Sequence, residues 1–193
     1  AMDIVAKHNV TLGIIPIGED NNNLAKVLGM PLEEAACEVI AARKVAHFDL
    51  GQANNIYFFS HLRMTKNIER IAVSHQGYKV MPKAQCSEVA VHNFWPPTEE
   101  PYDQQLRKIN PQDGLLDLVI KSQEQATGLM QRFRKPALER VDSLIQGTNF
   151  EIKSFEYLPL LIDGYKVMKT PVAVRLADRK LKVIIGKTEQ EWI

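Results

Sequence analysis

From Arg43 onward, the sequence is divided into short runs of β-branched and aromatic residues, separated by polar and turn-forming residues. Runs of this length and spacing are typical of antiparallel sheets. Gln76-Gly77 and Asp163-Gly164 each separate two runs, and such pairs predict tight hairpin turns. The predicted strands are 45–50, 56–62, 70–74, 78–81, 89–94, 115–121, 149–155, 158–162, 165–168, 171–176 and 180–185. The pattern predicts a mainly β fold, a two-layer antiparallel β-sandwich.

The first forty residues have a different pattern. Residues 12–17 form an apolar run that predicts a buried strand, and Asn22 or Asn23 can then cap a short helix. Apolar residues at helical spacing predict further helices over 32–42 and 122–135. The predicted organisation is a short α/β segment over 1–30 and a β-sandwich domain over 31–193.

Charge and cysteine content exclude several classes of protein. The 24 basic and 23 acidic residues are spread along the whole chain, which argues against a nucleic-acid-binding protein. Cys37 and Cys86 are isolated, which favours a reducing, cytoplasmic location over a secreted disulfide scaffold. No run approaches the roughly 18 apolar residues of a membrane span. Any contact with a membrane is therefore expected to be peripheral, through a local basic face.

Gly13 and Gly18 have the glycine spacing of a phosphate-binding P-loop. That loop continues with Lys and then Ser or Thr, whereas Glu19 and Asp20 follow here. Two carboxylates would repel phosphate groups. We therefore reject a P-loop.

Several segments nevertheless resemble, in the same order, the motifs of diacylglycerol and sphingosine-type lipid kinases. The first is similar to the family motif Pro-x-Gly-Thr-x-Asn-Asp/Asn-Phe/Leu-Ala, and the most specific is the Asn-Pro-Gln-Asp-Gly-Leu-Leu-Asp stretch. The matching segments are 12–29, 48–51 with 57–59, 89–94, 110–120, and 161–164 with 171–172. The resemblance spans essentially the whole chain and implies the C-terminal part of a lipid kinase catalytic domain, with 1–30 as the remnant of the nucleotide-binding domain.

In that family the first motif places loop amides and a hydroxyl against the nucleotide phosphates. The resemblance therefore implies Gly18, Asp20, Asn22 and Asn23 as degenerate nucleotide-binding positions for ATP. The family's Thr falls on Asp20 or Glu19, so that an anion replaces a hydroxyl donor.

The resemblance also implies a cation site around Asp113. Family members hold a divalent cation there with the Asp side chain and nearby main-chain carbonyls, which here would be those of Asn110 and Leu115. Oxygen ligands of this kind suit Mg²⁺ or Ca²⁺. The alternative is that Asp113-Gly114 is simply a turn that enters a strand.

The family's catalytic turn reads Asp-Gly-Glu, and its Glu is the base that takes the proton from the lipid hydroxyl. The matching residues are Asp163, Gly164 and Tyr165, so Asp163 keeps its place while Tyr165 occupies the position of the base. A phenol with a reference pKa of about 10 is a poor base at neutral pH. We expect the turn to be kept without its chemistry.

Other candidate residues have structural interpretations. Phe58, Phe59, Phe94 and Trp95 are expected to pack in the core, with a lipid-binding groove as the alternative. The five histidines show no spacing typical of metal ligands, and we expect structural roles for them.

The family's Gly-Gly-Asp-Gly-Thr phosphate loop does not occur in this sequence. The resemblance thus implies a lipid kinase of the diacylglycerol type whose nucleotide-binding domain is missing from the chain, and which is inactive by itself. Its partners would be Mg²⁺, ATP in the complete enzyme, and a lipid such as diacylglycerol. The alternative is a non-catalytic lipid- or protein-binding module. An unrelated structural domain would require the ordered motifs to be coincidental.

Overall fold

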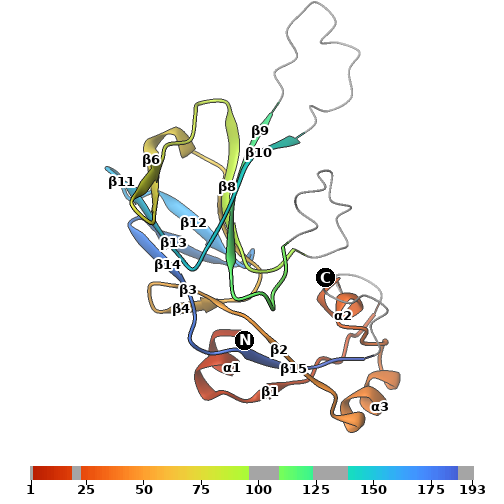
Figure 1. The fold of residues 1–193 in the computed structure, drawn as a ribbon. Coiled ribbons are helices and arrows are strands. Elements are labelled where there is room, and N and C mark those ends of the chain that lie inside the picture. Colours follow the sequence, from red (N-terminus) through yellow and green to blue (C-terminus); the bar gives the residue numbers. More distant parts are fainter. Residues whose placement is uncertain (1, 19–22, 96–108, 124–138, 187–193) are drawn as a thin grey trace, which may run out of the picture.

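The computed structural model describes residues 2–18, 23–95, 109–123 and 139–186. Two six-stranded antiparallel sheets pack face to face, and a small sheet with helices lies beyond one end of them (Figure 1). The predicted mainly β fold and its two-layer sandwich are confirmed. None of the described helices is long and apolar enough to span a bilayer.

The first sheet of the sandwich has the order β4 (Ile56–Phe58), β3 (Gly51–Ala53), β14 (Val172–Leu176), β11 (Asn149–Ser154), β6 (Ile71–His75) and β7 (Tyr78–Val80). It includes the hairpins β3–β4 and β6–β7. Side chains alternate strictly in β6, where every second residue is buried. One face of the sheet therefore faces the core and the other faces solvent.

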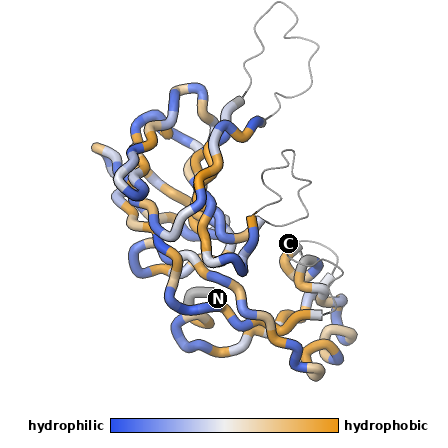
Figure 2. Tube along the Cα trace, in the orientation of Figure 1, coloured by the Kyte–Doolittle hydropathy of each residue, from blue (hydrophilic) through white to orange (hydrophobic). Residues whose placement is uncertain are grey.

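The second sheet has the order β10 (Glu139–Gly147), β9 (Leu116–Gln123), β8 (Cys86–His92), β5 (His61–Met64), β12 (Pro159–Ile162) and β13 (Lys166–Lys169). A short 3-10 helix, η1 (Ile68–Arg70), follows β5. Fully buried Leu62, Leu118 and Ile162 of this sheet meet Val73 and Phe150 of the first sheet in one core. Figure 2 shows apolar residues along these strands.

The two predicted hairpin turns are confirmed. Gln76 and Gly77 join β6 to β7 with φ angles of 46° and 82°, and Asp163 and Gly164 follow β12 with φ angles of 45° and 74°. Two successive positive φ angles match the right-handed twist of the flanking strands. These dipeptides therefore set the register of two hairpins.

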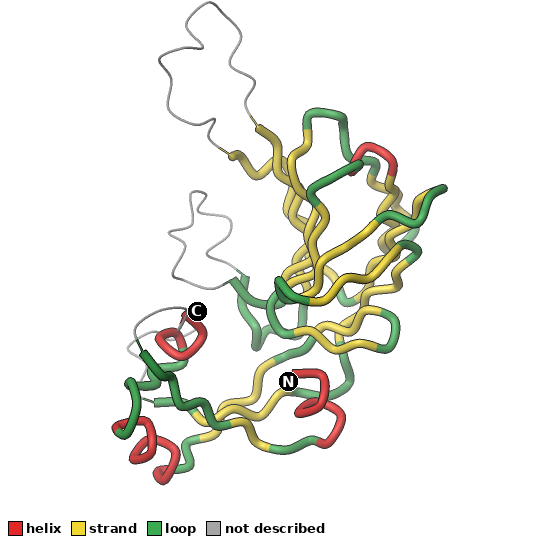
Figure 3. The backbone as a smooth tube through the Cα atoms, turned by 180° about the vertical axis from the view of Figure 1, so that it is seen from behind, coloured by secondary structure: helices red, strands yellow, loops and turns green. Residues whose placement is uncertain are grey.

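The small unit is built from both ends of the described chain. Its sheet has the order β1 (Thr11–Leu12), β15 (Leu181–Ile184) and β2 (Val45–Phe48), and its helices are α1 (Met2–His8), α2 (Asn23–Val27) and α3 (Ala35–Ala42). Figure 3 shows the α-helices of the described chain gathered in this unit. The predicted domain boundary at residue 30 does not separate this unit from the sandwich. Elements that come after residue 30, namely α3, β2 and β15, belong to the same sheet or the same core as residues 2–30.

Other predicted elements also differ from the structure. The apolar run 12–17 contributes little to a strand, since β1 ends at Leu12. Residues 122–123, predicted to begin a helix, belong to β9, and the rest of that predicted helix lies outside the described residues. Strand β10 was not predicted, because a bulge between Val141 and Ser143 interrupts the alternation of buried and exposed residues by which a strand is recognised.

Candidate functional site

The candidate residues meet where the small unit joins the sandwich, through a chain of hydrogen bonds around Asn93. This side chain is fully buried, and its Nδ2 donates to the carbonyl of Asp49 at 2.9 Å and to that of Phe59 at 2.8 Å. Phe59 stacks on Phe94 and contacts Phe48 edge-on, with ring centroids 5.0 and 5.8 Å apart. The aromatic residues predicted to be core are buried, so a lipid groove formed by them is excluded.

Asp163 is held by the backbone next to this junction. Its Oδ2 accepts the amide of Phe59 at 3.0 Å, and its Oδ1 accepts those of Ser60 at 2.8 Å and His61 at 3.1 Å. A carboxylate that binds three backbone N–H groups satisfies donors that no strand partner reaches. This contact gives Asp163 a structural role in fixing the turn between β12 and β13 against the start of β5.

Tyr165 stands at the end of the same turn. Its amide donates to the carbonyl of Ile162 at 3.1 Å, and its side chain is 60% exposed. The structure thus keeps the predicted turn geometry, with a phenol facing outward where the similar motif has a carboxylate.

The loop that carries Asp113 is bound to the start of the sandwich by a second carboxylate, Asp49. Asp49 is 3% exposed; its Oδ2 accepts the amide of Gly114 at 2.8 Å, and its Oδ1 pairs with Lys180 Nζ at 2.9 Å. The amide of Asp49 donates to the carbonyl of Pro111. Sequence reasoning missed this residue, although an acidic residue between Phe48 and Leu50 in an apolar run is a recognisable signal.

Asp113 itself lies on the surface of this loop. Its Oδ1 accepts the amide of Leu115 at 2.9 Å, and Oδ1 of Asn110 accepts the amide of Gln112 at 3.0 Å. Partial burial, and then the neighbouring charge of Asp49, raise the pKa of Asp113. Lys180, which pairs with Asp49, opposes this rise in the pKa of Asp113. In the described part of the chain, no cluster of three or more His, Cys, Asp or Glu side chains could hold a metal ion.

The predicted nucleotide-binding residues are only partly described. Gly18 is exposed with a φ angle of 73°, and Asn23 begins α2. Asp20 and Asn22 lie outside the described residues. Asn93 and Asp49 connect the Asp113 loop and the Asp163 turn at one junction. The predicted nucleotide-binding motif of residues 12–29 stays a prediction.

A buried polar row lies beside this junction, on the face of the second sheet opposite the core. His61, His92 and Asp117 are direct neighbours on β5, β8 and β9, and Trp95 lies against His92 at 4.8 Å between ring centroids. Both ring nitrogens of His92, His61 Nε2, Asp117 Oδ2 and Trp95 Nε1 are buried without a hydrogen-bond partner. Sequence reasoning missed the row because strand pairing alone brings these residues together.

Burial determines the charge state of the row. Burial, and then the charge of His61, lower the pKa of His92 well below its ordinary value, while burial and the charge of Arg63 lower that of His61. Burial raises the pKa of Asp117 to about 6, although Gln146 Nε2 donates to its Oδ1 at 3.0 Å. The histidines are therefore neutral at pH 7, and Asp117 carries a buried charge.

Asp117→Asn should stabilise the protein above pH 6. The pKa of Asp117 rises from 3.8 in the unfolded chain to about 6 in the folded one, so its stabilising contribution is full below pH 4 and is lost as the pH rises through 6. Asn cannot ionise and escapes that loss. The free energies of unfolding of the two proteins, from urea titrations, should agree at pH 4 and differ by about 3 kcal/mol at pH 7.5 in favour of Asn. A constant difference across this range would contradict the assignment.

Comparisons with known proteins place this geometry in a known fold. No protein-family model matches the chain, and no curated protein does. Among solved structures, a diacylglycerol kinase from Bacillus anthracis strain Sterne matches with a TM-score of 0.66 and 21% identity, over 91% of this chain and 67% of the other. A provisionally assigned diacylglycerol kinase from the same organism matches with a TM-score of 0.67 and 18% identity, over 91% and 69%. The chain therefore has the fold of the larger part of these proteins.

Proposed function

We propose that this chain is the lipid-binding part of a diacylglycerol-kinase-like lipid kinase, which transfers a phosphoryl group from ATP to a lipid hydroxyl only together with a nucleotide-binding domain. The observation that carries the proposal is the likeness in fold, which extends over 91% of this chain and 67% of a diacylglycerol kinase. The motif order supports it, as does the junction that joins the Asp113 loop to the Asp163 turn. By itself, this chain is proposed to be inactive.

Binding measurements test this division of roles. Calorimetry should show saturable binding of dioctanoylglycerol to the chain and no saturable binding of Mg-ATP in the micromolar range, because the phosphate loop of the similar kinases does not occur in this sequence. A clear micromolar isotherm with Mg-ATP would contradict the proposed inactivity. Absence of diglyceride binding would contradict the lipid-binding role.

The second candidate is a non-catalytic lipid- or protein-binding module with the same fold. Tyr165 favours it, since a phenol stands where a base is needed, and Asp163 cannot substitute because three backbone amides already occupy its carboxylate. The free thiols of Cys37 and Cys86 support a reducing, cytoplasmic location for either candidate.

We also propose that Asp113, with the carbonyls of Asn110 and Leu115, holds Mg²⁺. The residues suit the ion, since a surface carboxylate beside the charge of Asp49 and main-chain oxygens are hard ligands. A bound cation would tie the loop to the junction. It would supply positive charge there and would offset the repulsion between the two carboxylates.

Mg²⁺ should raise the thermal unfolding midpoint of the wild type and leave that of Asp113→Asn unchanged. A ligand that binds only the folded state at a hundredfold excess over its Kd stabilises by about 2.7 kcal/mol, which is a shift of several degrees. Asp178→Asn, at an exposed carboxylate outside the loop, is the matched control and should respond like the wild type. An equal shift in all three proteins would indicate a cation bound elsewhere.

A further inference from the structure

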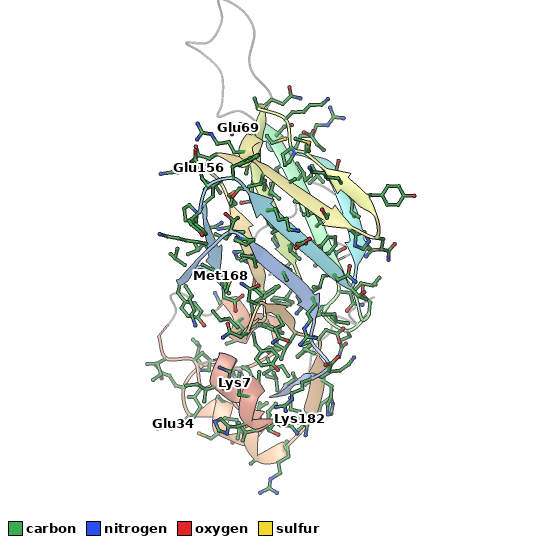
Figure 4. All side chains as sticks on the ribbon, turned by 90° about the vertical axis from the view of Figure 1, so that its left-hand side faces the viewer. Lys7, Glu34, Glu69, Glu156, Met168 and Lys182 are labelled. Atoms are coloured by element: carbon green, nitrogen blue, oxygen red, sulfur yellow. The ribbon has the colours of Figure 1, made fainter. Side chains whose placement is uncertain are left out.

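The buried polar row on the second sheet gathers polar atoms that the described chain leaves without partners. It crosses β5, β8 and β9 at His61, His92 and Asp117, away from the sheet edge at β13 that carries Met168 (Figure 4). His92 is 4% exposed, Asp117 0% and Trp95 8%. The atoms without a hydrogen-bond partner among the described residues are both ring nitrogens of His92, His61 Nε2, Asp117 Oδ2 and Trp95 Nε1. Buried polar groups of folded proteins are almost always hydrogen-bonded, which indicates a partner from outside the chain.

These atoms include both donors and acceptors. Trp95 Nε1 can only donate a hydrogen bond, and the ionised carboxylate of Asp117 can only accept one. Burial holds the pKa of His92 well below its ordinary value, so its ring is neutral, with one nitrogen that donates and one that accepts. A partner that serves all three side chains must therefore both donate and accept.

His61, at one end of the row, adds a further acceptor. Ser60 Oγ donates to the carbonyl of Phe94 at 3.4 Å and lies 2.8 Å from His61 Nδ1. Because the single hydroxyl proton of Ser60 is directed to Phe94, His61 Nδ1 donates to Ser60 Oγ. Burial and the charge of Arg63 lower the pKa of His61, so the ring is neutral and its Nε2 has a free lone pair. His61 Nε2 thus needs a donor.

Other kinds of ligand fit the row poorly. The described ranges contain no cluster of three or more His, Cys, Asp or Glu side chains that could hold a metal ion. An anion would meet the negative charge of Asp117 between neutral histidines. A larger molecule would have to displace Trp95, which packs in an apolar cluster with Ile109, Val119 and Val141. A small neutral molecule remains.

We propose that the polar row is a binding site for internal water, which hydrogen-bonds His92 and connects it to Trp95 and to Asp117. His92 is placed for this, because its ring lies 4.8 Å from that of Trp95 between centroids and Asp117 is its neighbour across the strands. Water both donates and accepts, and a buried water typically makes about three hydrogen bonds. The site goes beyond the proposed function, since it requires neither lipid nor ATP.

The test is the transfer of magnetisation from water to the indole N–H of Trp95 in the full chain, labelled with nitrogen-15, at pH 7. A long-lived internal water gives NOE and ROE cross-peaks of opposite sign, whereas direct hydrogen exchange gives the same sign in both. We expect opposite signs at Trp95. The chain has a second tryptophan, Trp192, so Trp95→Phe identifies the signal by removing it. Oxygen-17 relaxation dispersion of water, which hydrogen exchange does not affect, counts the long-lived waters independently.

Two variants of His92 separate hydrogen bonding from folding. His92→Phe fills the space of the water with a larger apolar ring, so the cross-peak at Trp95 should be lost and the oxygen-17 dispersion should decrease in amplitude. His92→Gln keeps a donor and an acceptor and should keep both signals. His47→Phe makes the same change at an exposed histidine outside the row and should match the wild type. Thermal midpoints show which variants fold.

The wild-type spectra decide the proposal even where His92→Phe does not fold. No cross-peak of internal water at Trp95 would overturn it, and so would a dispersion amplitude that a folded His92→Phe variant leaves unchanged. A stoichiometric metal in the purified protein would assign the ring nitrogens to an ion instead, and this result would overturn it as well.

Discussion

Lipid phosphorylation should be undetectable when this chain alone is incubated with labelled ATP, Mg²⁺ and mixed micelles of diacylglycerol. Phosphoryl transfer depends mainly on positioning and on charge stabilisation around the phosphates. A general base adds about 10²- to 10⁴-fold. In the proposed function, Tyr165 stands at the position of the base, and the phosphate loop does not occur in the sequence. Tyr165→Glu should therefore remain inactive on its own.

Fusion of the nucleotide-binding domain of a similar kinase ahead of Met2 separates the two deficits. The fused Tyr165→Glu protein should give product, and the fused wild type should give less by about 10²-fold or more. Tyr165→Gln in the same fusion is the matched control, since an amide has the shape of the carboxylate without its basicity. Labelled phospholipid from the unfused wild type would overturn the proposed inactivity, and equal product from the Glu and Gln fusions would show that residue 165 is no base.

The largest expected loss of stability comes from Asp163→Ala. The amides of Phe59, Ser60 and His61 lose the carboxylate that accepts them, and each unsatisfied buried amide costs about 1–3 kcal/mol. Ala also tolerates poorly the φ angle of 45° at this position. Because the site is only partly buried, we expect the free energy of unfolding to fall by about 3 kcal/mol, measured from urea midpoints at constant slope.

Asp163→Asn is the matched control for this prediction. Asn keeps an acceptor oxygen, has nearly the same shape and adopts positive φ angles more readily than Ala. Its loss should be about 1 kcal/mol, since only the charge and one oxygen are removed. Equal losses for Ala and Asn would mean that the carboxylate, and not the hydrogen-bonding geometry, carries the stabilisation.

Local chemistry made the hairpins and the alternating strands predictable. Gln76-Gly77 and Asp163-Gly164 adopt the positive φ angles that such pairs favour, and β6 buries every second residue as its pattern indicates. Strand β10 was not recognised because its bulge breaks this alternation, and the pairing of β15 with β1 depends on contacts across nearly the whole chain.

The candidate site was predictable in its parts but not in its connections. The Asp113 loop and the Asp163 turn were identified from short motifs, whereas the junction that joins them depends on Asn93 and Asp49, which the fold brings together. The same holds for His92, which lies in an apolar strand and becomes a buried neighbour of Asp117 only through the register of β8 and β9. Side chains that act across strands leave no local pattern in a sequence.

The pairing of Thr11 with Lys182 has a consequence for synthesis on the ribosome. Chains emerge with their first residues leading, so α1, β1 and β2 leave the exit tunnel long before β15 is made. Strands β3 to β14 already complete both sheets of the sandwich and can fold while translation continues. The small unit must wait for its central strand, and such distant pairing is slow to form. Until then, the buried face of β2 and its Phe48 stay accessible to chaperones, which makes the small unit the last part of the described chain to mature.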